Sequence, residues 1–293
     1  METLHSASRF KEKVLDVILD SKRIAEKPTG PGAGKWDIWR TYLRIVRLSR
    51  SKRGGTVNLL GFQVRYLDPA NLAHLFREIF VNRLYDVRLP IEAPTILDCG
   101  SNIGLSILFF KNLYPRAKIL GFEPSPLTFP VLVQNVQANR LRDVALQQTA
   151  LADKPGRLEF YVNTDEPGAL NAGLYGTHRN RVAVPVSAQR LSSYIDGEVD
   201  LLKLDIEGAE EMVIRDLAEH GALSRVRNLV CEYHHHHHRD RNGERLSITL
   251  SILEQAGFGY QLEAYCGRSR PQNILQDILI YAYRKDQVSR AVA

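Results

Sequence analysis

Acidic residues and glycines collect where an apolar run ends in this 293-residue chain, and the segment Asp98-Cys-Gly100-Ser-Asn102-Ile-Gly104 is the most informative of these places. It follows the strand-like residues Thr95–Leu97 and precedes a helical pattern. A strand, a glycine turn and a helix N-terminus together offer free backbone N–H groups to a ligand. A dinucleotide loop would carry a second glycine where Asn102 stands, and Asp98 is expected to place negative charge at the mouth of the cavity. The segment therefore suits a phosphate poorly.

A carboxylate at a strand tip attracts a cation. The ligand predicted here is S-adenosylmethionine, which carries a positive sulfonium and an ammonium group, and the predicted activity is methyl transfer. The residues expected to bind this donor from the first segment are Asp98, Gly100, Ser101, Asn102 and Gly104. Taken alone, the segment also fits a turn without a ligand.

Two further segments extend the predicted donor site. Glu123 and Pro124 end the next apolar run, nineteen residues after Gly104, which suits an acid that accepts both ribose hydroxyls. Pro124 would also suit the start of a helix without any ligand. Ala152 and Asp153 follow the third run, where Asp153 would accept from the adenine amine; a plain turn is an equal alternative.

The catalytic residues are expected after the fourth and fifth apolar runs, and Asp205 is assigned to the donor site as well. Asp205 and Glu207 follow a run that contains Lys203, a buried cation that needs a partner, although both acids also suit a helix start. His234 follows the next run and is the first choice for the base that removes the acceptor proton, because the pKa of an imidazole lies near neutrality. A neighbouring carboxylate is the alternative base.

Acceptor contacts are assigned to two places. Glu232 and Tyr233 precede His234, and Asn171 and Tyr175 belong to the glycine-rich loop 167–176. Asp205, Glu232 and His234 all end near one edge, so a divalent metal is considered there but not favoured. His235 to His238 continue the histidine run, and five consecutive residues point in different directions, so they cannot all bind one ion. These four are expected to form a solvated loop.

The order of the apolar runs predicts an α/β fold. Runs without alternation at 95–99, 118–122, 145–149 and 200–204 indicate parallel strands buried on both faces, with helices between them. Residues 156–162 and 181–186 alternate like an antiparallel insertion, and two closing strands are expected near 260–265 and 277–283.

The first ninety residues are expected to form two additions to one catalytic domain. Residues 1–55 are predicted as a helical extension, residues 56–91 as a hairpin and helix that brace the sheet, and residues 92–293 as the catalytic domain. The helix at 35–50 is expected to dock through a face containing Trp36 and Trp39, either on the main domain or on a second copy in a homodimer.

Composition narrows the class of protein. The net charge is +6, and residues 1–60 hold thirteen Lys and Arg against six Asp and Glu, so the remainder is nearly neutral. This distribution argues weakly against a nucleic-acid substrate. The three cysteines predict no disulfide, and no apolar stretch is long enough to insert stably in a membrane, so a cytoplasmic location is expected.

Three segments in this order, Asp98 to Gly104, Phe122-Glu123-Pro124 and Lys203-Leu-Asp205-Ile-Glu207-Gly-Ala-Glu210, resemble the FkbM family of S-adenosylmethionine-dependent methyltransferases. The resemblance covers about residues 56–283. It implies a class I methyltransferase sheet, Rossmann-like and mostly parallel, with a reversed last strand. It also implies S-adenosylhomocysteine as product and methylation mostly of hydroxyls on small natural products or sugars. The donor-binding roles that it implies fall on Asp98, Gly100, Asn102, Gly104 and Glu123.

Four alternatives stay open beside O-methylation of a small molecule. They are N-methylation of a small molecule or peptide, a nucleic-acid methyltransferase, a dinucleotide-dependent oxidoreductase, and a ligand-sensing protein without turnover. An Asn/Asp-Pro-Pro-Tyr segment typical of base-amine enzymes is absent from the sequence, and Asn102 disfavours the oxidoreductase.

Overall fold

A seven-stranded sheet forms the centre of the protein, which we describe from a computed structural model. The structure describes residues 17–26, 33–51, 53–163, 173, 181–234, 246–264 and 277–286. In the order of the sheet, the strands are β11 (Phe258–Ala264), β12 (Ile278–Arg284), β10 (Asn228–Tyr233), β9 (Leu201–Leu204), β3 (Thr95–Cys99), β4 (Lys118–Phe122) and β5 (Val144–Gln147).

The directions of the strands follow the predicted pattern. Strands β5, β4, β3, β9 and β10 are parallel, whereas β12 runs antiparallel to both β10 and β11. The expected parallel sheet with a reversed last strand is therefore confirmed. Chain order reverses between β3 and β9, because β4 and β5 extend the sheet on one side of β3, and α/β proteins bind ligands at such a point.

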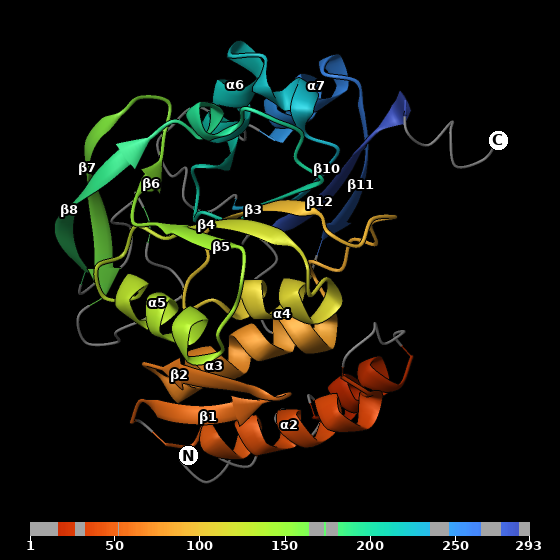
Figure 1. Ribbon diagram of the computed structural model, residues 1–293, viewed down its shortest axis with the longest axis vertical. Coiled ribbons are helices and arrows are strands. Elements are labelled where there is room, and N and C mark those ends of the chain that lie inside the picture. Colours follow the sequence, from red (N-terminus) through yellow and green to blue (C-terminus); the bar gives the residue numbers. More distant parts are fainter. Residues whose placement is uncertain are drawn as a thin grey trace, which may run out of the picture.

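Helices cover both faces of the sheet (Figure 1). The helices α4 (Leu105–Leu113) and α5 (Phe129–Ala138) lie on one face, and α6 (Glu210–Glu219) and α7 (Leu246–Gln255) lie on the other. All four residues of the central strand β9 are buried, as expected for a strand in a sheet with helices on both faces. Short 3-10 turns occur at η2 (Leu191–Tyr194) and η3 (Ala222–Arg225).

A smaller sheet stands beside the main one (Figure 1). It consists of β6 (Ala150–Leu151), β8 (Arg181–Gln189) and β7 (Gly156–Asn163), with β7 and β8 antiparallel. The alternating residues at 156–162 and 181–186 thus form the expected insertion. Of the loop between β7 and β8, only Gly173 is among the described residues, so Asn171 and Tyr175 lie outside them.

The N-terminal segments pack under α4 and α5 (Figure 1). The hairpin β1 (Gly55–Leu59) and β2 (Phe62–Tyr66) contacts α5, and α3 (Pro69–Phe76) continues into the π-helical segment η1 (Arg77–Asn82). Asp68 caps α3 by accepting hydrogen bonds from Ala70 and Asn71. The boundaries at residues 55 and 91 stay a prediction.

Helix α2 (Lys35–Leu48) forms where the sequence predicts it, but it buries a different face. Its buried residues are Ile38, Tyr42 and Ile45, while Trp36 is 65% exposed and stacks on Trp39 with 5.0 Å between ring centres. The helical residues 17–26 cover part of the remaining surface, since Trp39 donates to Ser21. A homodimer through this helix stays a prediction.

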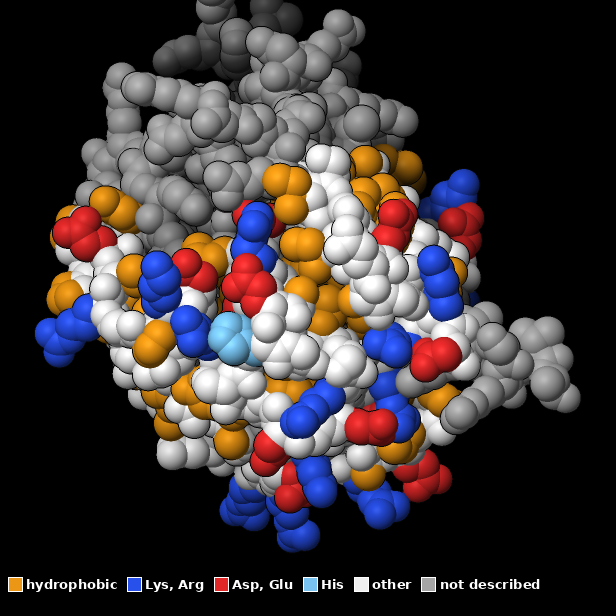
Figure 2. Space-filling view, turned by 90° about the horizontal axis from the view of Figure 1, so that it is seen from above, with side chains coloured by type: hydrophobic (Ala, Val, Ile, Leu, Met, Phe, Trp, Pro, Cys, Tyr) orange, Lys and Arg blue, Asp and Glu red, His pale blue; other side chains and the backbone are white. Residues whose placement is uncertain are grey.

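Charges of both signs are interspersed on the described part of the face that Figure 2 shows, with hydrophobic side chains between them. The distribution agrees with the near-neutral composition of the chain beyond residue 60. Within the part of the chain that the structure describes, none of the helices combines the length and the apolar character needed to cross a bilayer.

Candidate active site

The glycine turn after β3 lies directly against the residue that follows β9. Gly100 has a φ of +82°, and a Cβ added to it would lie 1.8 Å from the carbonyl oxygen of Asp205. Only glycine tolerates both this conformation and this approach. Gly104 has a φ of +93° and caps α4, where a Cβ would lie 2.8 Å from Leu132, so a larger residue would disturb the packing of the helix. The turn therefore brings the predicted donor loop and the predicted catalytic acid together.

Asp98 does not lie at the mouth of the site. Its side chain is fully buried, with Oδ2 accepting from the Ser106 hydroxyl at 2.6 Å and Oδ1 lying 3.3 Å from Nζ of Lys203. The expectation that Asp98 presents its charge to the ligand was wrong, because the strand turns this side chain inward, where a buried carboxylate needs a cation. Asp98 supports the loop from beneath.

Lys203 contacts the predicted donor loop and the carboxylates of Asp98 and Asp205. Its ammonium donates to the carbonyl oxygens of Gly100 at 2.6 Å and Cys99 at 3.2 Å, and it lies 3.4 Å from Oδ2 of Asp205. Burial would lower the pKa of Lys203, but the carboxylates of Asp205 and Asp98 outweigh it and raise the pKa. Lys203 was expected to need a partner, and it has two: Asp98 beneath the loop and Asp205 at the candidate site.

Glu123 lies at the end of β4 beside the turn. Its two oxygens accept backbone N–H groups, Oε2 from Asn102 and Oε1 from Ser125, each at 2.9 Å. Burial raises the pKa of this carboxyl to about 7, and these hydrogen bonds oppose the rise. A carboxyl held in this way keeps lone pairs for a ligand's hydroxyls. Contacts of Glu123 and the adjoining Pro124 with ribose stay a prediction.

The other predicted donor residues serve the loop or lie near it. Ser101 is buried and donates to the carbonyl of Asp98 at 2.9 Å. Ala152 is buried after β6, whereas Asp153 is exposed in a turn and its carbonyl accepts from Arg190. The turn that the sequence offered as an alternative at Asp153 is thus present, and the adenine contact stays a prediction.

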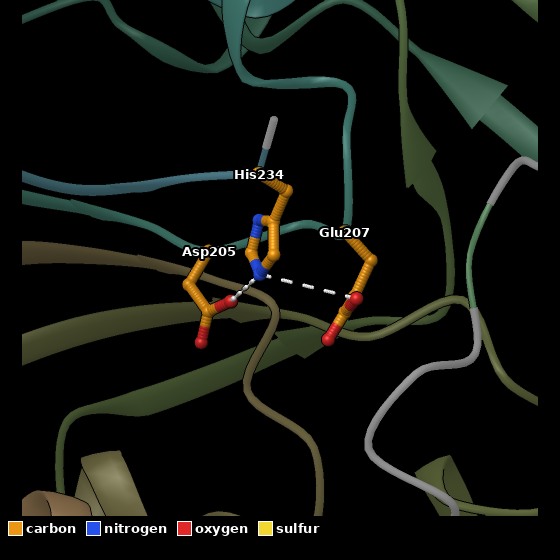
Figure 3. A group of neighbouring side chains, drawn as sticks. All are labelled: Asp205, Glu207 and His234. Atoms are coloured by element: carbon orange, nitrogen blue, oxygen red, sulfur yellow. Dashed lines mark ion pairs between the residues drawn. The ribbon is translucent and has the colours of Figure 1, made fainter. Parts of the chain in front are cut away.

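Asp205 is held by two residues at one of its oxygens. Oδ2 accepts from the hydroxyl of Tyr85 at 2.8 Å and faces Lys203, and the pKa of Asp205 is lowered because Lys203 and His234 outweigh its burial. Oδ1 faces the imidazole of His234, whose Nε2 lies 3.8 Å away (Figure 3). Glu207 approaches the same nitrogen from the other side, with Oε2 at 3.9 Å.

His234 is buried at the end of β10, and its second ring nitrogen is paired with Glu210. Nδ1 lies 2.8 Å from Oε1 of Glu210, an oxygen that also accepts the backbone N–H groups of Ile206 and Gly208. Burial would lower the pKa of His234, but Glu207 and Glu210 raise it well above the usual value. A histidine with a raised pKa holds its proton more firmly, which favours the alternative of a neighbouring carboxylate as base. The role of His234 in proton removal stays a prediction.

The two residues before His234 point to opposite sides of the sheet, as successive strand residues must. Glu232 is half-buried, and burial together with the charge of Asp205 raises the pKa of its carboxyl well above the usual value. Tyr233 is 1% exposed and belongs to the core under α6 and α7. The structure corrects the prediction that Tyr233 contacts the acceptor, and His235 to His238 lie outside the described residues.

Sequence reasoning missed three residues at this edge. Tyr85 comes from the N-terminal brace, 120 positions before its partner Asp205. Glu210 was named only as part of a matched segment, and Asp277, directly before β12, lies close to Glu232 and His234. Nothing local in the sequence marks Tyr85 or Asp277, whereas the spacing of Glu210 from Asp205 and Glu207 was visible.

Comparisons with known proteins identify the family of the chain. The Methyltransferase FkbM domain matches residues 98–260. Methyltransferase sdnD of Sordaria araneosa is 35% identical over 219 residues, which cover 63% of this chain and 81% of sdnD. The 31-O-demethyl-FK506 methyltransferase FkbM of Streptomyces tacrolimicus is 27% identical over 208 residues, 59% of this chain and 79% of the relative.

A third relative and one solved structure are also similar. The 2-O-methyltransferase NoeI of Sinorhizobium fredii (strain NBRC 101917 / NGR234) is 29% identical over 158 residues, which cover 48% of this chain and 63% of NoeI. A crystal structure of the FkbM methyltransferase of Methylobacillus flagellatus has a TM-score of 0.48 at 15% identity, covering 85% of this chain and 60% of that one.

The sheet order, the reversed last strand and the glycine turn at the switch point define a class I methyltransferase. The matched domain spans more than half of the chain, and with it the chain belongs to the FkbM methyltransferase family. It is an enzyme that transfers a methyl group.

Proposed function

We propose that this enzyme transfers the methyl group of S-adenosylmethionine to a hydroxyl oxygen of a small natural product or sugar. The observation that carries the proposal is the contact of the donor loop with the acid group: Gly100 lies against Asp205, and Asp205, Glu207 and His234 meet at one edge. A donor site next to a proton acceptor, at the switch point of the sheet, is what methyl transfer to a hydroxyl requires, and the contact supports that reaction.

The donor is expected to lie over the turn after β3. Its ribose hydroxyls would donate to Glu123, and backbone N–H groups at the start of α4 would donate to its carboxylate. Asp98 and Lys203 hold the turn in place from beneath and do not need to contact the donor. Preorganisation of the loop by buried groups lowers the cost of binding.

The reaction is an in-line displacement at the methyl carbon. A bond forms between the acceptor oxygen and the methyl carbon while the carbon–sulfur bond breaks and its electron pair stays on sulfur, which gives neutral S-adenosylhomocysteine. The enzyme aligns the two substrates and removes the hydroxyl proton. Glu207 or Asp205 would receive that proton, and His234, held by Glu210, keeps the two carboxylates in position.

Two similarities support oxygen as the acceptor atom. The relatives from Streptomyces tacrolimicus and Sinorhizobium fredii carry names that state O-methylation, one at position 31 of an FK506 precursor and one at a 2-O position. The nearly neutral charge of the chain beyond residue 60 fits a small acceptor better than a polyanion.

The test is a methyl-transfer assay on the full chain with labelled S-adenosylmethionine and a panel of polyols, glycosides, amines and RNA. We expect label on hydroxyl oxygens of small acceptors, and Glu207→Gln to lower kcat about 100-fold or more while S-adenosylhomocysteine still binds. Label on amines or RNA alone would refute the proposed acceptor. Failure to bind the donor would refute the proposed reaction.

A further inference from the structure

Three side chains that can bind metals converge at the edge of the sheet, and their donor atoms all lie within 4.8 Å of one another (Figure 3). Nε2 of His234 lies 3.8 Å from Oδ1 of Asp205 and 3.9 Å from Oε2 of Glu207. Both separations exceed the length of a hydrogen bond. They are somewhat wider than the roughly 3 Å that separates neighbouring ligands around an octahedral ion with bonds of about 2.1 Å. We propose that Asp205, Glu207 and His234 bind a divalent metal cation.

The groups around this triad hold each ligand from behind. Glu210 binds Nδ1 of His234 at 2.8 Å, which leaves Nε2 directed at the two acids. Metal-binding histidines nearly always have such a carboxylate or carbonyl on the second nitrogen. Tyr85 and Lys203 hold Oδ2 of Asp205, and Oδ1 is the oxygen that faces the imidazole. The side chains of His234 and Asp205, two of the three proposed ligands, are therefore oriented before an ion binds.

The backbone at Glu207 gives an independent indication. Glu207 has a φ of +56°, a conformation that side chains other than glycine, asparagine and aspartate rarely adopt. A Cβ at Gly173 would lie 3.0 Å from the Cβ of Glu207, so the chain passes close against it. Strained residues of this kind concentrate at sites where a side chain must be aimed. Here the strain directs the carboxylate of Glu207 at His234.

The ligand chemistry indicates the kind of ion. Carboxylates suit Mg²⁺, Ca²⁺ and Mn²⁺, whereas an imidazole suits zinc and other transition metals, so a mixed set favours a first-row cation such as Mn²⁺. Three protein ligands leave positions for water and for a substrate oxygen. This part of the inference rests on the proposed function. The ion would bind the acceptor hydroxyl, lower its pKa and direct the oxygen at the methyl carbon, and the oxygen of Glu207 that does not bind the ion would receive the hydroxyl proton.

A second triad shares the same histidine. Glu232, His234 and Asp277 also offer donor atoms within 4.8 Å of one another. We assign the ion to the first triad because Asp205 is the residue that touches the donor loop. The two assignments differ in one testable way, since the first predicts that Asp277 is dispensable for metal binding.

The experiment must exclude the histidine run, which could bind transition metals by itself. The full chain is therefore prepared with His235→Ser, His236→Ser, His237→Ser and His238→Ser, stripped with EDTA and titrated with Mn²⁺ while free Mn²⁺ is followed by electron paramagnetic resonance. On this background we compare His234→Ala, Glu207→Asn and Asp277→Asn. Asparagine tolerates the positive φ at residue 207, so this variant removes the carboxylate without new strain.

We expect stoichiometric Mn²⁺ binding on this background, a loss of affinity of at least tenfold in His234→Ala and Glu207→Asn, and a change below twofold in Asp277→Asn. Unchanged affinity in Glu207→Asn, or a tenfold loss in Asp277→Asn, would overturn the assignment. Circular dichroism reports whether His234→Ala folds, and Glu207→Asn decides the question if it does not.

A methyl-transfer assay separates this inference from the proposed function. If the background binds Mn²⁺ and its activity falls after EDTA and returns with Mn²⁺, the ion takes part in the reaction. If Mn²⁺ binds but EDTA leaves the transfer rate unchanged, the ion has no catalytic role. If Mn²⁺ binds and no acceptor is methylated at all, the metal site stands and the proposed reaction fails.

Discussion

Glu123 has the environment from which a pH dependence follows directly. Its carboxyl is buried, accepts two backbone N–H groups and has a pKa of about 7. Ribose hydroxyls donate to the charged form more readily than to the neutral one, so binding of S-adenosylhomocysteine would lower this pKa. By linkage, affinity must then rise with pH around the pKa of the free enzyme.

We therefore expect the Kd of S-adenosylhomocysteine to fall as pH increases from 6 to 8, by at most tenfold per pH unit. Glu123→Gln should bind S-adenosylhomocysteine more weakly and with little dependence on pH.

The stability of the fold should change with pH in the opposite direction to the affinity. Between pH 4.5 and 7 the carboxyl of Glu123 keeps its proton in the folded state and loses it in the unfolded state. The free energy of unfolding of the wild type, relative to that of Glu123→Gln, therefore falls as pH rises across this range. Calorimetry and urea unfolding measure the two quantities, and a flat wild-type affinity would contradict this role for Glu123.

Gly100 and Gly61 form a matched pair of glycines with positive φ, +82° and +93°. An alanine Cβ at residue 61 meets nothing within 4 Å, whereas at residue 100 it collides with the carbonyl of Asp205. Gly61→Ala should cost about 1 kcal/mol through its conformation alone. Gly100→Ala should cost about 1–3 kcal/mol more through overpacking, and weaken donor binding. If urea unfolding gave the same loss of unfolding free energy for Gly61→Ala and Gly100→Ala, the loop would accommodate the added methyl group, and the overpacking argument would be wrong.

At the scale of elements, Lys203 of β9 joins three parts: strand β3 through Asp98, the donor loop through the Gly100 carbonyl, and Asp205. A buried ion pair adds little net stability to a fold, but removing its cation is costly because the buried carboxylate is then left without a partner. The register supports this, because Lys203 lies directly opposite Asp98 across the β3–β9 pair.

Lys203→Met should therefore lower the unfolding free energy by about 3–5 kcal/mol, since it leaves Asp98 buried and uncompensated. Adding Asp98→Asn should recover part of that loss, and urea unfolding of the single and double variants measures the coupling. The control is Lys118→Met at the exposed start of β4, expected within about 0.5 kcal/mol. Strictly additive losses would mean that the pair does not act as a unit.

At the scale of the whole molecule, one apolar core connects the N-terminal segments to the sheet. It runs from Ile24 and Ile45 through Phe76 to Ile96 of β3 and Leu201 of β9. Asp20, fully buried, anchors the helical residues 17–26 by accepting from Tyr42 at 2.5 Å and pairing with Arg77 at 2.7 Å. We infer that the first described helix unfolds together with the sheet.

Asp20→Ala should lower the stability of the whole chain by about 3–5 kcal/mol, because Arg77 loses a buried partner. The matched control in the same helix is Glu26→Gln, whose partner Lys22 is 71% exposed and whose loss should change stability by less than about 1 kcal/mol. Calorimetry should show one transition shifting to lower temperature for Asp20→Ala. A separate low-temperature transition would show that the N-terminal segment unfolds independently.

Local patterns determined the strands, the order of the elements and the glycines at which the chain turns. The predicted strands Thr95–Cys99 and Lys118–Phe122 coincide with β3 and β4 because unbroken apolar runs are buried on both faces of a parallel sheet. The glycine at residue 100 marked a turn after the strand, but the sequence did not show that the turn would lie against Asp205.

Tertiary structure alone decided the directions in which the charged side chains point and the shifts of their pKa values. Asp98 turns under the loop toward Lys203, Tyr85 reaches Asp205 from the brace, and three carboxylates raise the pKa of His234. These outcomes depend on distances between residues far apart in the chain, and electrostatic interactions vary steeply with such distances and with burial. A sequence specifies which ionisable groups are present, and the packed fold sets their neighbours and therefore their chemistry.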